Sequence, residues 1–117
     1  MTPARWQALL EEVTLIGGVR GAAVVSAEDG LVVHEAAMDG VATADVAALA
    51  TALVRRAQSL LQVLGDEVPR MVTLAATRGT LVAVQGKLDL WLVALAEPGA
   101  ELGRLRLLLG DLAPELG

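Results

Sequence analysis

The chain has 117 residues, a net charge of −5 and no cysteine, and 55% of its residues are hydrophobic. This length predicts a single domain over residues 1–117, large enough to fold without disulfide bonds. The lack of cysteine excludes thiol catalysis and cysteine-ligated zinc, and the acidic balance argues against nucleic acid, whose binding needs a basic face.

The sequence predicts no membrane insertion. The uncharged stretch of residues 46–54 is far shorter than the ~20 residues that a spanning helix needs. The first residues carry Glu11 and Glu12 on an amphipathic pattern, which differs from a basic and then apolar signal peptide. We therefore expect a cytoplasmic protein.

The first predicted element is a helix that begins at Thr2-Pro3, because Thr can cap a helix and Pro fits the first helical position. Gly17-Gly18 is expected to stop it. Its apolar side chains recur at helical spacing: Trp6, Leu9, Leu10 and Val13.

Two strands are predicted next, over Gly21–Ser26 and Leu31–Ala36, joined as a hairpin at Asp29-Gly30. A loop over residues 27–30 places Ser26 opposite Leu31 and His34 opposite Ala23. Side chains alternate between the faces of a strand, so Ser26 and the single histidine would lie on opposite faces. Serine catalysis is therefore not expected, because the nucleophile needs a base within hydrogen-bond reach.

A long helix is predicted over residues 42–64, with Gly65 as its C-terminal cap. Its expected apolar stripe is Val46, Leu49, Ala50, Leu53, Ala57, Leu60, Leu61 and Leu64. The opposite face has mostly small or uncharged side chains: Ala44, Ala48, Thr51, Arg55, Ser59 and Gln62. Since a solvated helix face usually carries several charges, either a second subunit or partner covers this face, or alanine is simply frequent in the sequence.

Three further strands are predicted over Met71–Thr77, Thr80–Gln85 and Leu88–Leu95, with turns at Arg78-Gly79 and Gly86-Lys87. The run 71–77 contains no charge and no proline. At a sheet edge such a strand would be a site for pairing with another chain, whereas in the centre it would simply be core.

A final helix is marked by leucines at helical spacing: Leu102, Leu105, Leu109 and Leu112. The order of elements predicts an α+β sandwich, in which helices cover a sheet of five antiparallel strands. Profilin-like, longin-like and sensor domains have this arrangement.

No motif predicts an enzyme, a cofactor or a metal site. Gly86-Lys87 is followed by Leu88 and a strand, whereas a phosphate-binding loop needs Ser or Thr and a helix. The carboxylate pairs at Glu11-Glu12, Glu28-Asp29 and Asp66-Glu67 lie beside helix ends or turns, where solvated side chains are usual, and no spacing suits metal ligands.

The stretches Gly18–Ser26 and Asp29–Val32 resemble the opening hairpin of roadblock/dynein light chain domains. The alanine-rich helix at 42–64, the Gly65 break, the Gly79 turn and the helix around Leu102–Arg106 match the same pattern. The resemblance implies a profilin-like roadblock sandwich with strand order 2-1-5-4-3. One long helix would cover one face and the two terminal helices the other, with strand 71–77 at an edge.

The resemblance also implies a homodimer, formed through the edge strand and the long helix, with a sheet continuous across both subunits. The residues expected in this interface are Met71, Val72, Thr73, Leu74, Ala75, Ala48 and Thr51. Bacterial members of the MglB-type subgroup act on Ras-like small GTPases, and other members are scaffolds. The residues expected to contact such a partner are Arg55, Arg56, Ser59 and Gln62.

An activator of this kind would reposition the GTPase's own groups and supply no catalytic residue itself. A passive dimeric scaffold fits the pattern equally well. The alternative function is a small-molecule sensor of the profilin-like type, which would need an internal pocket.

Overall fold

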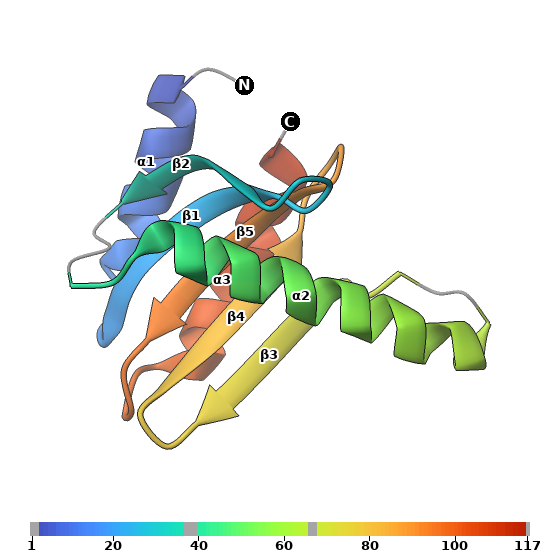
Figure 1. The fold of residues 1–117 in the computed structure, drawn as a ribbon. Coiled ribbons are helices and arrows are strands. Elements are labelled where there is room, and N and C mark those ends of the chain that lie inside the picture. Colours follow the sequence, from blue (N-terminus) through green and yellow to red (C-terminus); the bar gives the residue numbers. More distant parts are fainter. Residues whose placement is uncertain (1–2, 37–39, 66–67, 117) are drawn as a thin grey trace.

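The computed structural model describes residues 3–36, 40–65 and 68–116. The elements in chain order are α1 (Pro3–Thr14), β1 (Val19–Ser26), β2 (Leu31–Ala36), α2 (Thr43–Leu61), the 3₁₀ turn η1 (Gln62–Leu64), β3 (Met71–Ala76), β4 (Gly79–Gln85), β5 (Leu90–Ala96), α3 (Leu102–Leu112) and η2 (Ala113–Glu115). The strands form one antiparallel sheet in the order β2-β1-β5-β4-β3 (Figure 1). The predicted α+β class and strand order are confirmed.

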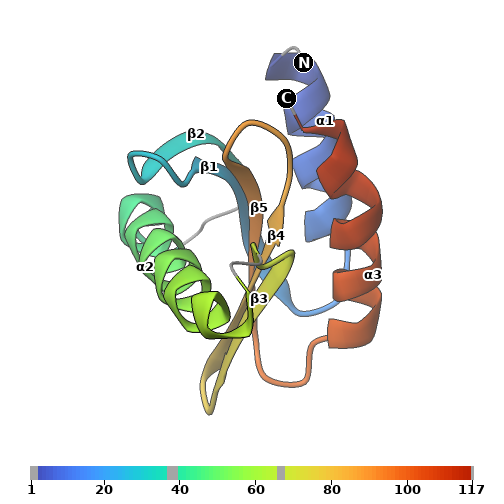
Figure 2. The ribbon, with the colours of Figure 1, turned by 90° about the vertical axis from the view of Figure 1, so that its right-hand side faces the viewer.

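The molecule has three layers, with α2 on one face of the sheet and α1 with α3 on the other (Figure 2). Alternation along β1 divides its side chains between two cores. Ala22 and Val24 pack with α1 and α3, whereas Ala23 and Val25 pack under α2. The central strands β4 and β5 are buried on both faces, which is why their sequences are almost continuously apolar.

Gly18 fixes the entry into the sheet. Its φ is +86°, and a Cβ at this position would lie 2.7 Å from the Cα of Ala100. The Gly18 carbonyl accepts a hydrogen bond of 2.7 Å from the Glu97 backbone N–H. A residue with a side chain would therefore be strained and would also collide with the backbone before α3.

Several predicted boundaries in the sheet were wrong by one or two residues. Strand β1 begins at Val19, and β5 begins at Leu90. Leu88 and Asp89 lie instead in the β4–β5 turn with φ of 55° and 59°, which strand backbone does not allow. The predicted meander itself is confirmed.

The predicted partner of His34 was also wrong. Ser26 lies opposite Leu31 as predicted, but a bulge between Val24 and Val25 places His34 opposite Val24. His34 therefore faces α1, where its Nε2 lies 2.6 Å from Oε1 of Gln7. Ser26, two residues after Val24, lies on this same face, so the predicted separation of Ser26 and His34 onto opposite faces was wrong. No hydrogen bond joins the two side chains in the part of the chain that the structure describes.

The predicted apolar stripe of α2 was rotated from the observed one. The side chains of α2 that are buried are Val46, Ala47, Ala50, Thr51 and Val54. Leu49 and Leu60 are instead 44% and 73% exposed. Small side chains let the helix backbone lie close to the sheet, so the larger leucines remain at its sides. Gly65 ends η1 with φ of +114°, as predicted.

Within residues 3–36, 40–65 and 68–116, no helix has the length and apolar character needed to cross a bilayer.

Candidate interaction surface

Strand β3 forms one edge of the sheet and pairs only with β4 among the described residues. From Met71 to Ala76 it carries no charge and no proline, and its side chains are exposed except for the half-buried Val72. Sheet edges normally carry charges, prolines or bulges that prevent pairing with other chains. The unguarded edge of β3 is therefore suited to strand pairing.

Both faces of β3 carry apolar side chains. Val72 and Leu74 lie opposite Ala83 and Leu81 of β4, on the α2 side of the sheet. On the other side, Met71 lies opposite Val84. A strand added at this edge would extend both apolar faces of the sheet.

Helix α2 crosses the sheet and continues past β3, so that its C-terminal end projects beyond the edge (Figure 1). Large apolar side chains remain exposed on the projecting end, on the segment that follows it and on β3. We call these side chains the edge surface: Leu60, Val63, Leu64, Val68, Met71 and Leu74. They are six of the twelve large hydrophobic side chains exposed among the described residues, so half of these side chains gather at one edge.

The charges that the structure describes near the edge surface are basic. Arg56, Arg70 and Arg78 are exposed and have no ion pair within the described residues. The acidic side chains of the described chain belong to residues 11–45 and 89–115. A protein of net charge −5 therefore carries, beside its most apolar edge, arginines that have no ion pair among the described residues.

The residues predicted to form a dimer interface fall into two groups. Met71, Val72, Thr73, Leu74 and Ala75 all lie on the edge strand. Ala48 and Thr51 lie away from it and line a shallow groove with Asp29 and Gly30 of the β1–β2 turn.

Thr51 is only 6% exposed, and its Oγ1 donates a hydrogen bond of 2.8 Å to the Ala47 carbonyl. Its side chain is therefore part of the core of this chain. Leu49 and Leu60 are the exposed α2 side chains that sequence analysis missed, because it assigned them to the core. The signal that was available is an overlapping stripe, in which the smaller residues 47 and 54 accompany 46 and 50 at helical spacing.

The predicted partner residues on α2 differ in how far they are engaged within the chain. The Arg55 guanidinium donates to the carbonyl oxygens of Glu28 and Ala27 at 3.0 and 3.4 Å. Ser59 Oγ donates to the Arg55 carbonyl at 3.1 Å. The exposed side chains of Arg56 and Gln62 make no hydrogen bond to any described residue. Arg56 and Gln62 are thus the ones most available to a partner.

The described residues contain no group of three or more His, Asp or Glu side chains that could hold a metal ion. This side of the molecule combines apolar area, an open strand edge and arginines without an ion pair in the part of the chain that the structure describes. Such a surface is suited to binding protein.

Comparison with known proteins relates the chain to one family. The family model described as Roadblock/LC7 domain matches residues 6–96. Among curated proteins, none matches this sequence. Because the family model spans most of the 117 residues, it establishes membership directly.

Solved structures agree with this fold. The Roadblock/LC7 domain from Streptomyces avermitilis aligns with a TM-score of 0.82 at 23% identity, covering 92% of this chain and 91% of that one. Myxococcus xanthus MglB aligns at 0.85 with 17% identity, over 97% and 85% of the two chains. The gliding protein MglB from Thermus thermophilus aligns at 0.81 with 21% identity, over 99% and 94%. These structural alignments support the shared fold, and the match to the family model shows that the chain belongs to the Roadblock/LC7 domain family.

Proposed function

We propose that this protein is a homodimeric regulator or scaffold that binds a Ras-like small GTPase in the cytoplasm. The observation that carries the proposal is the unguarded β3 edge beneath the projecting, leucine-bearing end of α2. Membership in the Roadblock/LC7 family and the likeness to MglB structures support a role in GTPase regulation. In this proposal, the domain spans residues 1–117.

The dimer would form by antiparallel pairing of β3 with β3 of a second copy. A two-fold axis makes such an interface self-complementary, since each β3 supplies the same donors and acceptors to the other. The projecting end of α2 would then lie over the partner's sheet. Leu60 and Leu74 would be removed from water, at ~25 cal/mol per Å² of apolar surface buried.

The GTPase would contact the α2 side of this dimer. Arg56, Ser59 and Gln62 are exposed there, and Arg56 and Gln62 are the least engaged with their own chain. An arginine inserted into the active site of the GTPase is not expected from Arg55, because insertion would break its hydrogen bonds to the hairpin carbonyls. We therefore propose activation, where it occurs, through repositioning of the GTPase's own catalytic groups.

The alternative function, a small-molecule sensor, has less support. The cavities identified among the described residues have volumes of about 260–370 Å³ and are open grooves on the surface. The interior on both faces of the sheet is filled by apolar side chains. An internal ligand would have to displace this core.

The experiment that tests the proposal combines solution mass with GTPase kinetics. Sedimentation at micromolar concentration should give twice the chain mass of 12.1 kDa. Binding of the Ras-like GTPase from the same genome is measured in its GTP-analogue and GDP forms, with single-turnover hydrolysis in parallel. Acceleration with GTP-selective binding indicates an activator, and binding without acceleration indicates a scaffold. A monomer, or no binding to either form, would contradict the proposal.

A further inference from the structure

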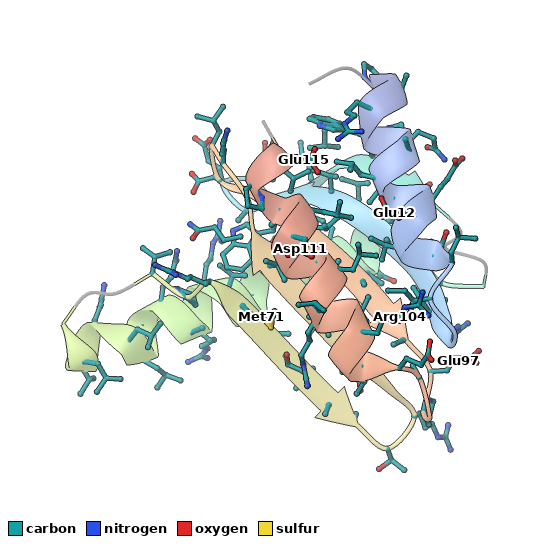
Figure 3. The ribbon with its side chains drawn as sticks, turned by 180° about the vertical axis from the view of Figure 1, so that it is seen from behind. Glu12, Met71, Glu97, Arg104, Asp111 and Glu115 are labelled. Carbon is teal, nitrogen blue, oxygen red and sulfur yellow. The ribbon has the colours of Figure 1, made fainter. Side chains whose placement is uncertain are left out.

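A groove with a volume of about 300 Å³ lies on the opposite side of the sheet from α2, between the C-terminal end of α1 and helix α3. Its walls are helical, since Glu12 comes from α1 and Arg104, Leu107 and Asp111 come from α3. Figure 3 views this side of the molecule directly. The groove shares no residue with the edge surface, and the sheet lies between the groove and α2.

The groove is lined by apolar side chains that are unusually exposed. Leu15 is 84% exposed and Leu107 is 69% exposed, and the half-buried Leu108 lies with them in the lining. Helix α3 buries three other leucines, Leu105, Leu109 and Leu112, in the core against the sheet. The exposed pair therefore adds nothing to the core of this chain, and it gives the groove two apolar contact points on opposite walls.

The charge of the groove is net negative. Glu12 on α1 and Asp111 on α3 belong to its lining and have no ion pair within the described residues (Figure 3). The third charged residue of the lining, Arg104, has its Nη1 atom 3.6 Å from the Glu101 carboxylate, which offsets its charge. A carboxylate on each wall thus flanks the exposed leucines.

We propose that this groove binds an amphipathic helix of another protein, with apolar anchors that contact Leu15, Leu107 and Leu108 and with Lys or Arg beside them. A helix suits a groove between two helices, where its anchors recur at i, i+3/i+4 and i+7. The basic flanks follow from Glu12 and Asp111, whose carboxylates a matching ammonium or guanidinium would pair.

A second copy of this chain fits the groove less well than a basic helix does. Two grooves facing each other across a two-fold axis would each present Glu12 and Asp111 to an equally acidic surface. Like charges brought together at an interface lower affinity. The proposal does not depend on the GTPase or on the β3 dimer, since its residues lie on α1 and α3 and the segment that follows α1.

The test uses a library of displayed 16-residue helical peptides, selected on the full chain and counter-selected on the variant Leu107→Glu. Leu107 is exposed, so this variant is expected to fold normally. Selected sequences should carry leucine-like residues at i, i+3/i+4 and i+7 beside Lys or Arg, and should bind the variant at least tenfold more weakly. Leu31→Glu is the matched control, because Leu31 is 62% exposed and lies outside the groove.

Charge reversal provides the second measurement. The double variant Glu12→Lys/Asp111→Lys should bind the selected basic peptides with at least tenfold lower affinity. It should instead bind versions of these peptides in which Glu replaces Lys or Arg. The control double variant Glu28→Lys/Glu35→Lys, at exposed positions outside the groove, should retain the original preference. The proposal is overturned if no helical sequence is enriched, if the enriched sequences are acidic or uncharged, or if the control variants lose as much affinity as the groove variants.

Discussion

At the scale of single residues, substitutions at Gly18 and Gly99 allow the cost of backbone strain to be measured apart from the cost of a steric collision. Both have positive φ, +86° and +84°, but a Cβ at Gly18 would meet Ala100, whereas at Gly99 nothing lies within 4 Å. We expect Gly18→Ala to lower the free energy of unfolding by about 2–4 kcal/mol, and Gly99→Ala to lower it by about 1 kcal/mol. Urea denaturation at one fixed protein concentration measures both. Equal losses would show that Ala100 moves aside at little cost.

Adjacent arginines on α2 should have different roles. Arg55→Ala removes the hydrogen bonds to the Ala27 and Glu28 carbonyls, and should lower the free energy of unfolding by about 0.5–1 kcal/mol. Arg56→Ala should leave that free energy within about 0.5 kcal/mol of the original, while weakening GTPase binding about tenfold, or ~1.4 kcal/mol. Unfolding and binding titrations on both variants separate the roles. Unchanged GTPase affinity in Arg56→Ala would remove this residue from the proposed contact.

At the scale of elements, the edge strand carries the clearest prediction. Leu74→Asp should convert the proposed dimer to a monomer, because its carboxylate would be buried without a partner where two β3 strands meet. Leu74 is 39% exposed in the single chain, so the monomer should still fold. Sedimentation measures the mass, and circular dichroism checks the fold. Leu107→Asp, the same change at an exposed leucine away from β3, should leave the mass unchanged. A Leu74→Asp protein of unchanged mass would mean that the interface lies elsewhere.

Elements were predictable where their residue pattern had one interpretation. The glycine turns and the apolar runs identified the strands to within two residues, and the resemblance gave the strand order. Helix α2 was harder, because Val46 and Ala50 belong to two overlapping stripes. One stripe continues through leucines and the other through smaller residues, and periodicity alone does not tell which faces the sheet. Close packing selected the smaller residues. The same ambiguity explains why Leu49 and Leu60 were wrongly predicted to lie in the core and Thr51 on the surface.

The bulge in β1–β2 was not predictable either. Register was counted outward from the turn, and one extra residue on β2 moved His34 to the face of α1. The back groove was missed for a different reason. Leu15 and Leu107 are ordinary apolar residues in sequence, and only the packing of α1 against α3 leaves them exposed on either side of a cavity.

At the scale of the whole molecule, stability should depend on protein concentration. A dimer that buries the edge surface is stabilised by mass action, so its thermal midpoint rises as the total concentration rises. The thermal midpoint of Leu74→Asp should be lower and independent of concentration. Differential scanning calorimetry over a hundredfold concentration range measures both. A midpoint that is constant for the original protein would argue against a dimer coupled to folding.

The three-layer arrangement also predicts that the two proposed binding sites act independently. The α2 face and the edge surface apart from Met71 lie away from the α1/α3 side of the sheet, whereas the groove between α1 and α3 lies on that side. A helical peptide in the groove should therefore leave GTPase affinity within twofold of its value without peptide, and Leu74→Asp should leave peptide affinity equally unchanged. Calorimetric titration of the peptide with and without saturating GTPase measures this coupling. Since coupling between sites is reciprocal, either titration order should give the same factor.

A factor near one allows a single dimer to hold a GTPase and a second protein together, as a scaffold requires. Mutual exclusion would mean that the layers shift together when either site is filled.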